Sequence, residues 1–119
     1  MKASFLMTAL FQASIMAVMC GVATEASAGD VDNGRTLARG SQCTHCHGVD
    51  GNARSTSVQP IPMLAGQPSA YMVEQMKNYA EGIRLSSTKN FDVMVKELRL
   101  LSEEDFADIA AYYEAQKRY

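Results

Sequence analysis

The chain has 119 residues, of which 47% are hydrophobic, and its formal net charge at pH 7 is −2. This length favours a single domain. No cluster of lysine and arginine stands out along the sequence, which argues against a protein that binds nucleic acid.

The first residues have the order of features found in a secretory signal peptide. Lys2 supplies a positive start, an apolar run extends from Phe5 to about Val22, and Ala26-Ser27-Ala28 provides the small residues after which signal peptidase cuts. We therefore predict a signal peptide at residues 1–28 and a mature domain at residues 29–119, located in the periplasm. The alternative is that the apolar run stays on the protein as a membrane anchor, since it is just long enough to span a bilayer.

Two helices with a long loop between them are predicted in the first part of the mature domain. The first runs from Asp30 to about Gln42, and the second runs from Ser69, which can cap it, to about Glu81, where Gly82 ends it. The stretch 48–68 carries glycines and prolines throughout and is predicted to be a loop. Such a long loop is uncommon in a compact domain unless it serves a function, and wrapping a cofactor is one such function.

The clearest helix opens at Ser102. Acidic residues fill its first turn, where negative charge suits the exposed backbone amides. An apolar stripe follows at helical spacing: Phe106, Ile109, Ala110 and Tyr113. The segment 83–90 is predicted to be loop, and 91–100 loop or short helix. No alternating apolar pattern is long enough for a sheet, so the mature domain is predicted to be all-α.

The cysteines of the mature chain lie three positions apart in Cys43-Thr44-His45-Cys46-His47. This is the C-x-x-C-H pattern that attaches a c-type haem. Each thiol adds to one haem vinyl group, and His47 then supplies an axial nitrogen to the iron. A covalent cap also suits thiols that enter an oxidising compartment. We predict one haem c, bound through Cys43 and Cys46 with His47 as an iron ligand.

A zinc site and a dithiol redox motif are the alternatives for these residues. Zinc requires a second pair of ligands further along, and the mature chain has no cysteine or histidine outside the motif. A thioredoxin-type dithiol belongs in a βαβ unit, whereas no strand is predicted here.

The second axial ligand of the iron cannot be a histidine of this chain. His45 lies between the two cysteines, too close to His47 to reach the opposite haem face. Methionine is the usual choice in electron carriers. The mature chain offers four: Met63, Met72, Met76 and Met94. The second and third are one helical turn apart and are more simply core residues. An iron without a sixth protein ligand is the remaining possibility.

Several segments together resemble the class I cytochromes c, and most closely the branch that also forms each half of the periplasmic dihaem cytochromes. These segments are C-T-H-C-H-G-V-D-G-N at 43–52, P-M-L-A-G-Q at 62–67, the helix with Tyr71 and Gln75, G-I-R at 82–84, and L-S-E-E-D-F-A-D-I-A-A-Y-Y at 101–113. The resemblance implies the small class I fold, in which three to five helices wrap around one haem.

The resemblance also implies roles for single residues. In that branch the axial methionine stands seven positions before the residue that opens the L-S-x-x-D helix, which implies Met94. The Pro62 carbonyl is implied to accept a hydrogen bond from the second ring nitrogen of His47 and so to orient the ring.

Other residues keep two interpretations. Gly34 is implied to let the first helix cross closely over the last, near residues 112–113, although it also fits a weak helix start. Tyr79, Arg84 and Lys89 could meet the haem or its propionates, and they equally fit an ordinary surface.

An iron with histidine and methionine ligands has no open position for a substrate, so we predict an electron carrier and not an enzyme. Its partners would be a transient redox donor and acceptor, with no membrane span in the mature chain. One alternative is the haem subunit of a larger dehydrogenase, such as a flavocytochrome c sulfide dehydrogenase. Another is an open-iron protein that binds CO or NO or turns over peroxide, but the four-helix cytochromes of that type carry C-x-x-C-H near the C-terminus.

Overall fold

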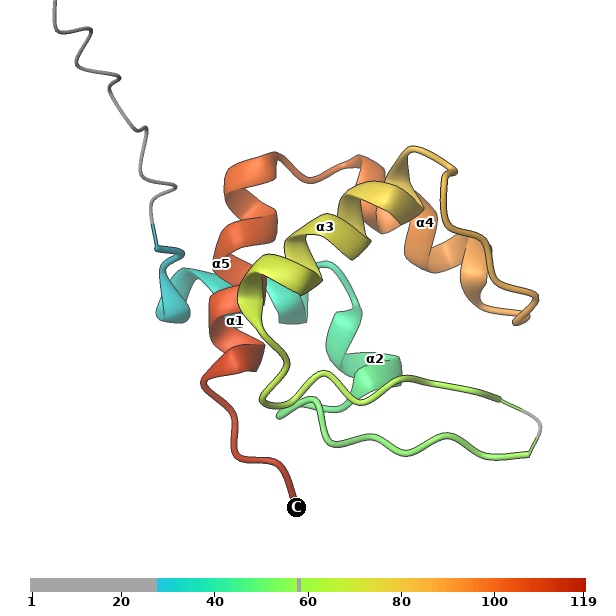
Figure 1. Ribbon diagram of the computed structural model, residues 1–119, viewed down its shortest axis with the longest axis horizontal. Helices are drawn as coiled ribbons and strands as arrows, with labels where there is room; N and C mark the ends of the chain where they lie inside the picture. Colours follow the sequence, from blue (N-terminus) through green and yellow to red (C-terminus); the bar gives the residue numbers. More distant parts are fainter. Residues whose placement is uncertain (1–27, 58) are drawn as a thin grey trace, which may run out of the picture.

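The computed structural model describes residues 28–57 and 59–119, and this part of the chain is built from helices (Figure 1). The described ranges contain no strand, which confirms the predicted all-α class, and their five helices agree with the three to five expected. Residues 1–27 of the predicted signal peptide lie outside the described residues, so its boundary stays a prediction. Among the described helices, none is both long and apolar enough to cross a membrane.

Helix α1 spans Val31–Gly40 and begins at a side-chain cap. The Asp30 carboxylate accepts hydrogen bonds from the backbone amides of Asp32 and Asn33, at 2.9 and 3.0 Å. These amides belong to the first turn of the helix and have no partner within it, so the aspartate stabilises the start of α1.

Helix α5 spans Glu103–Glu114 and begins at Ser102, as predicted. The Ser102 hydroxyl accepts a hydrogen bond from the Asp105 amide at 3.1 Å, and the Asp105 carboxylate accepts one from the Ser102 amide at 2.9 Å. This reciprocal capping box satisfies two amide donors and fixes where the helix starts.

The two helices cross with their backbones in direct contact at Gly34 (Figure 1). A Cβ atom added to Gly34 would lie 1.9 Å from the Asp108 carbonyl oxygen and 3.0 Å from the Tyr112 Cβ, which confirms the close crossing near residue 112. Asp108 strengthens it: this buried carboxylate accepts hydrogen bonds from the Asp30 amide at 2.7 Å and from Asn33 Nδ2 at 2.6 Å. The start of α1 is therefore tied to the middle of α5.

The remaining helices are α2 (Cys43–His47), α3 (Ser69–Ala80) and α4 (Phe91–Arg99). Helix α3 packs on α5, and α4 packs on α3 (Figure 1). One boundary differs from the prediction: Ser69 is the first residue of α3 and not its cap, because Pro68 occupies the N-cap position. Of the two alternatives predicted for 91–100, loop or short helix, the structure has the helix, because Val95 and Leu98 bury one face of it.

The core lies where α1, α3 and α5 meet. Its buried cluster consists of Ala38, Met72, Ile109, Ala110, Tyr112 and Tyr113. Cys43 and Leu64 pack against this cluster from the haem-attachment motif and the loop that follows it. The core is thus continuous with the candidate site.

Replacing Gly34 by alanine should destabilise the protein by about 1–3 kcal/mol, because the new methyl group overlaps the Asp108 carbonyl and the helices must separate. The free energy of unfolding is measured on the holoprotein in guanidinium chloride. Gly40→Ala is the matched control, since a Cβ there meets nothing within 4 Å; it should be neutral or stabilising by up to about 1 kcal/mol. Equal losses in both variants would contradict the close crossing.

Candidate haem site

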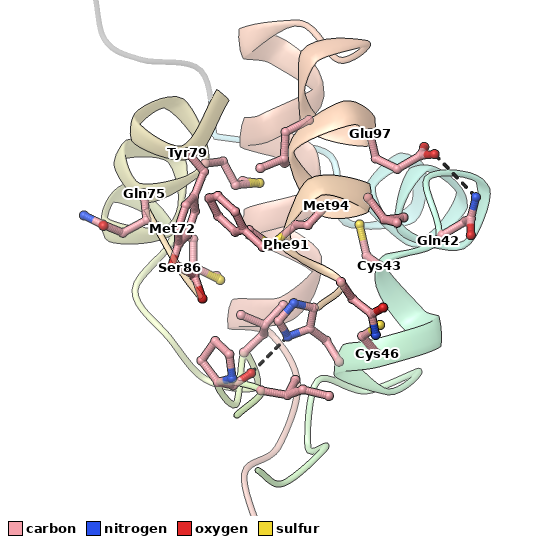
Figure 2. A pocket seen from close by; sticks show the side chains of 18 of the residues that line it. Gln42, Cys43, Cys46, Met72, Gln75, Tyr79, Ser86, Phe91, Met94 and Glu97 are labelled. Atoms are coloured by element: carbon pink, nitrogen blue, oxygen red, sulfur yellow. Dashed lines mark hydrogen bonds between the residues drawn. The ribbon is translucent and has the colours of Figure 1, made fainter. Parts of the chain in front are cut away.

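A cavity of about 400 Å³ lies between α2, α3, α4, α5 and the loop around residues 59–64 (Figure 2). This volume is in the usual range for a site that holds a small molecule or cofactor. Most of its wall is apolar, and these residues include Leu64, Met76, Phe91, Leu98, Leu101 and Ile109. Such a wall suits a large, flat, hydrophobic group.

Both cysteines of the motif border this cavity from α2 (Figure 2). Positions i and i+3 lie on the same face of a helix, so α2 presents the two thiols together. Both are free thiols and half-buried. Burial, helped by the charges of Glu97 and Cys46, raises the pKa of Cys43 to about 11. Cys43 is therefore a neutral thiol at physiological pH.

His47 ends α2 and is oriented by the loop opposite. Its Nδ1 lies 3.0 Å from the Pro62 carbonyl oxygen. Because a carbonyl only accepts hydrogen bonds, Nδ1 must carry the proton and Nε2 keeps its lone pair. Burial lowers the pKa of His47, and the hydrogen bond to Pro62 opposes this only in part. The result is a neutral imidazole with one nitrogen ready to bind a metal.

The loop that carries Pro62 is held by Gly51, which the sequence marks only as part of the predicted loop at 48–68. The Gly51 carbonyl accepts hydrogen bonds from the amides of Leu64 at 2.8 Å and Ala65 at 3.1 Å. Gly51 has φ +74°, and an added Cβ would lie 2.7 Å from both the Ala65 amide nitrogen and Tyr113 Cδ1. The sequence Asp-Gly-Asn is a turn signal that marks this position, but it does not reveal the two contacts.

The last helix also holds this loop, through one tyrosine hydroxyl and one backbone carbonyl that sequence reasoning missed. Tyr112 donates to the Val49 carbonyl at 2.5 Å, and the Gly66 amide donates to the Tyr113 carbonyl at 2.9 Å. Both segments that flank the loop are therefore attached to α5.

All four candidate methionines line the cavity. Met72 is 6% exposed and belongs to the core cluster, and Met76 packs against that cluster. Met94 enters from α4 and is half-buried (Figure 2). Met63 follows Pro62 directly in the loop.

Of the three residues expected either to meet the haem or to lie on an ordinary surface, two reach the cavity. Tyr79 and Arg84 line it, whereas the exposed Lys89 is not among the lining residues. The structure thus separates two neighbouring cations of the same loop.

The residues present fit a c-type haem. Two thiols stand on one face of a short helix, and a neutral imidazole follows them. An apolar cavity that methionine thioethers also line adjoins the thiols and the imidazole. In the part of the chain that the structure describes, no three His, Cys, Asp or Glu side chains are grouped as a metal site would require.

Comparison with known proteins gives the same answer. The sequence pattern of the family described as Cytochrome c matches residues 31–116. The chain is similar to a cytochrome c4 of Pseudomonas aeruginosa, with 38% identity over 91 residues, which are 76% of this chain and 40% of that one. It is also similar to cytochrome c-554(548) of Halomonas halodenitrificans, with 41% identity over 76 residues, 63% of this chain and 84% of that one.

A cytochrome c4 of Stutzerimonas stutzeri is 35% identical over 95 residues, and here too the match covers only 43% of the relative. The chain thus spans about two fifths of the length of these cytochromes c4. Because the family pattern covers most of the domain, including both thiols and the imidazole, the chain belongs to the cytochrome c family and carries a c-type haem bound covalently through Cys43 and Cys46.

Proposed function

We propose that the protein is a periplasmic electron carrier, and not an enzyme, with His47 and Met94 as the axial ligands of its haem. Family membership supports haem-based electron transfer in general. The observation that carries the finer statement is the cavity between α2 and α4, which the His47 imidazole and the Met94 thioether both line. Cys43, Cys46 and Pro62 complete the proposed site.

The position of Pro62 favours Met94 over Met63. The Pro62 carbonyl is hydrogen-bonded to His47, so this loop lies on the imidazole side of the site. Met63 begins one residue later, about 3.8 Å away along the backbone, and would have to reach around the cofactor to bind its far face. Met94 comes from a separate helix on the cavity wall and needs no such detour.

Core packing argues against the other two methionines. Met72 is nearly fully buried in the same cluster as Ile109 and Tyr113. Withdrawing its side chain to bind iron would leave a hole in this cluster, and such cavities are costly. Met76 packs against the same cluster and serves the core in the same way.

When bound, the haem supplies an iron that gains and loses one electron. The chain keeps this exchange free of other chemistry. His47 offers a fixed Nε2 and Met94 a thioether, which together leave no coordination position for a substrate, and a methionine ligand raises the reduction potential. The apolar wall keeps water out and disfavours the more highly charged oxidised state. No residue has to move a proton, which is the reason we assign no enzymatic role.

Export and free diffusion are the remaining parts of the proposal. The N-terminal sequence, with its charged start, apolar run and Ala-Ser-Ala exit, supports a periplasmic location. The match to this domain covers 84% of the relative cytochrome c-554(548), which supports the proposal of a free carrier. The alternative is a haem subunit of a dehydrogenase complex. Such a subunit would be bound permanently to a larger protein, whereas a carrier binds its partners only transiently.

Met94→Ala should open one axial position of the iron. We expect the reduced variant to bind CO rapidly and stoichiometrically at neutral pH, whereas the parent protein should not. The oxidised variant should lose the weak charge-transfer absorption of a methionine–iron bond. Absorption spectroscopy measures both. Met63→Ala is the matched control and should behave as the parent protein. If Met94→Ala left the spectra unchanged and Met63→Ala changed them, the ligand would be Met63.

Purification from the native periplasm separates carrier from subunit. A free carrier should elute as a small protein, and affinity capture should recover partners in less than stoichiometric amounts that are lost at high salt, because such redox interfaces are small and polar. Partners are identified by mass spectrometry. A stoichiometric large subunit that survives high salt would establish the dehydrogenase-subunit alternative instead.

A further inference from the structure

The chain reverses direction after α3 and brings Arg84 back along that helix. Gly82 has φ +75°, a conformation that favours glycine. The next two amides, of Ile83 and Arg84, both donate to the Asn78 carbonyl, at 2.8 and 3.0 Å. This turn directs the Arg84 side chain toward the cavity face of α3.

Two side chains of α3 hold the Arg84 guanidinium in place. Arg84 Nη1 donates to Gln75 Oε1 at 2.6 Å, and Arg84 Cζ lies 4.7 Å from the ring centroid of Tyr79. Gln75 and Tyr79 are one helical turn apart, so they form a single platform beneath the planar group. A flexible side chain is thereby restricted to one position.

This guanidinium has no counter-charge in the part of the chain that the structure describes. The ion pairs found there join other residues, Arg35 with Asp32 and Lys77 with Glu103. Of the five N–H donors of Arg84, one is used by Gln75. Arg84 is half-buried and is the only lysine or arginine among the residues that line the cavity. A cation in such a place needs an anionic partner.

The cavity has two chemically different ends. Cys43 and Cys46 stand at one end, and Gln75, Tyr79 and Ser86 stand at the other (Figure 2). Glu97, the one carboxylate that lines the cavity, is at the cysteine end, where Gln42 donates a hydrogen bond to it at 3.4 Å. The Glu97 carboxylate and the Arg84 guanidinium are therefore at opposite ends of the cavity.

A haem has a matching polarity. The vinyl groups that react with cysteine and the two propionates occupy opposite halves of the porphyrin rim. Attachment through the two thiols directs the propionates away from Glu97 and toward the end where Arg84 is held.

We infer that Arg84 binds a haem propionate, with Gln75 and Tyr79 as positioning residues for its guanidinium. Arginine suits this role because its planar fork can make two parallel hydrogen bonds to one carboxylate. The inference goes beyond the proposed axial ligation and does not depend on it, since it needs only the covalent haem of the family. The bound cation also opposes the extra positive charge of the oxidised iron, so Arg84 raises the reduction potential.

The test compares holoprotein variants that each remove one positive charge from the same loop. Arg84→Met keeps the length of the side chain without its charge, and Lys89→Ala removes an exposed cation that does not line the cavity. Reduction potentials are measured by titration against mediators. Redox-difference infrared spectra report on the propionate carboxylates directly, with haem labelled with ¹³C at those groups.

Arg84→Met should lower the potential so that the equilibrium constant for electron uptake from a fixed donor falls several-fold, where tenfold corresponds to about 59 mV. It should also shift the labelled carboxylate bands. Lys89→Ala should change the equilibrium constant by no more than a few tens of per cent and should leave the labelled carboxylate bands unshifted, because the charge of Lys89 is screened by solvent. Gln75→Leu should shift the bands in the same direction by less, since the charge stays but its support is lost.

Equal potentials and unshifted carboxylate bands in Arg84→Met would overturn the inference, even if that variant were less stable. Where Arg84→Met does not mature with haem, Arg84→Lys is used: it should keep the potential close to the parent value and still shift the bands, and unshifted bands would overturn the inference there too. The methionine charge-transfer absorption is followed in the same samples. Its absence from the parent protein would count against Met94 and would leave the assignment of Arg84 standing.

Discussion

The crossing of α1 over α5 at Gly34 is the contact on which the rest of the structure depends. Backbone meets backbone at this crossing with no room for a side chain, and the Asp108 carboxylate holds the start of α1 on α5. Helix α2 begins three residues after α1 ends, so the same crossing determines where the two thiols stand. Further along α5, Tyr112 and Tyr113 attach the segments that flank the loop of Pro62. The thiols and the loop that orients His47 are thus both positioned by the packing of α1 on α5.

The cavity beside this crossing differs from a simple apolar pocket because its two charged side chains, Glu97 and Arg84, lie at opposite ends. The thiols and Glu97 occupy one end, and Gln75 and Tyr79 occupy the other (Figure 2). These two side chains hold the Arg84 guanidinium at their end. Covalent attachment through the two cysteines fixes only one edge of a haem and leaves the opposite edge without an anchor. A fixed cation at that edge gives the group a second anchor, and the two anchors act on chemically different halves of the same ring.

The sequence was most informative where chemistry depends on neighbouring residues. The C-x-x-C-H motif identified the attachment site from five adjacent positions. Ser102 and the acidic residues after it identified the start of α5 in the same way, because both signals are local. For α4 the sequence did not decide between loop and short helix, since the burial of Val95 and Leu98 comes from the neighbouring packing and not from a strong local signal. The contacts of Gly51 with Ala65 and Tyr113 join positions 14 and 62 residues apart, which no spacing rule reveals.

Electron transfer makes unusual demands on a protein because no bond of a substrate is made or broken. The same site has to hold the cofactor equally well in two states that differ by one charge, so side chains that rearranged between them would only slow the exchange. The contacts around this cavity are of the kind that resist rearrangement. The Pro62 carbonyl holds the imidazole, Gly51 and α5 hold the loop of Pro62, and Gln75 and Tyr79 hold the one cation. The imidazole and the cation that line the cavity are therefore each supported by a second group behind them. A site built in this way is suited to tuning a reduction potential, which supports the proposed role of this domain as a carrier.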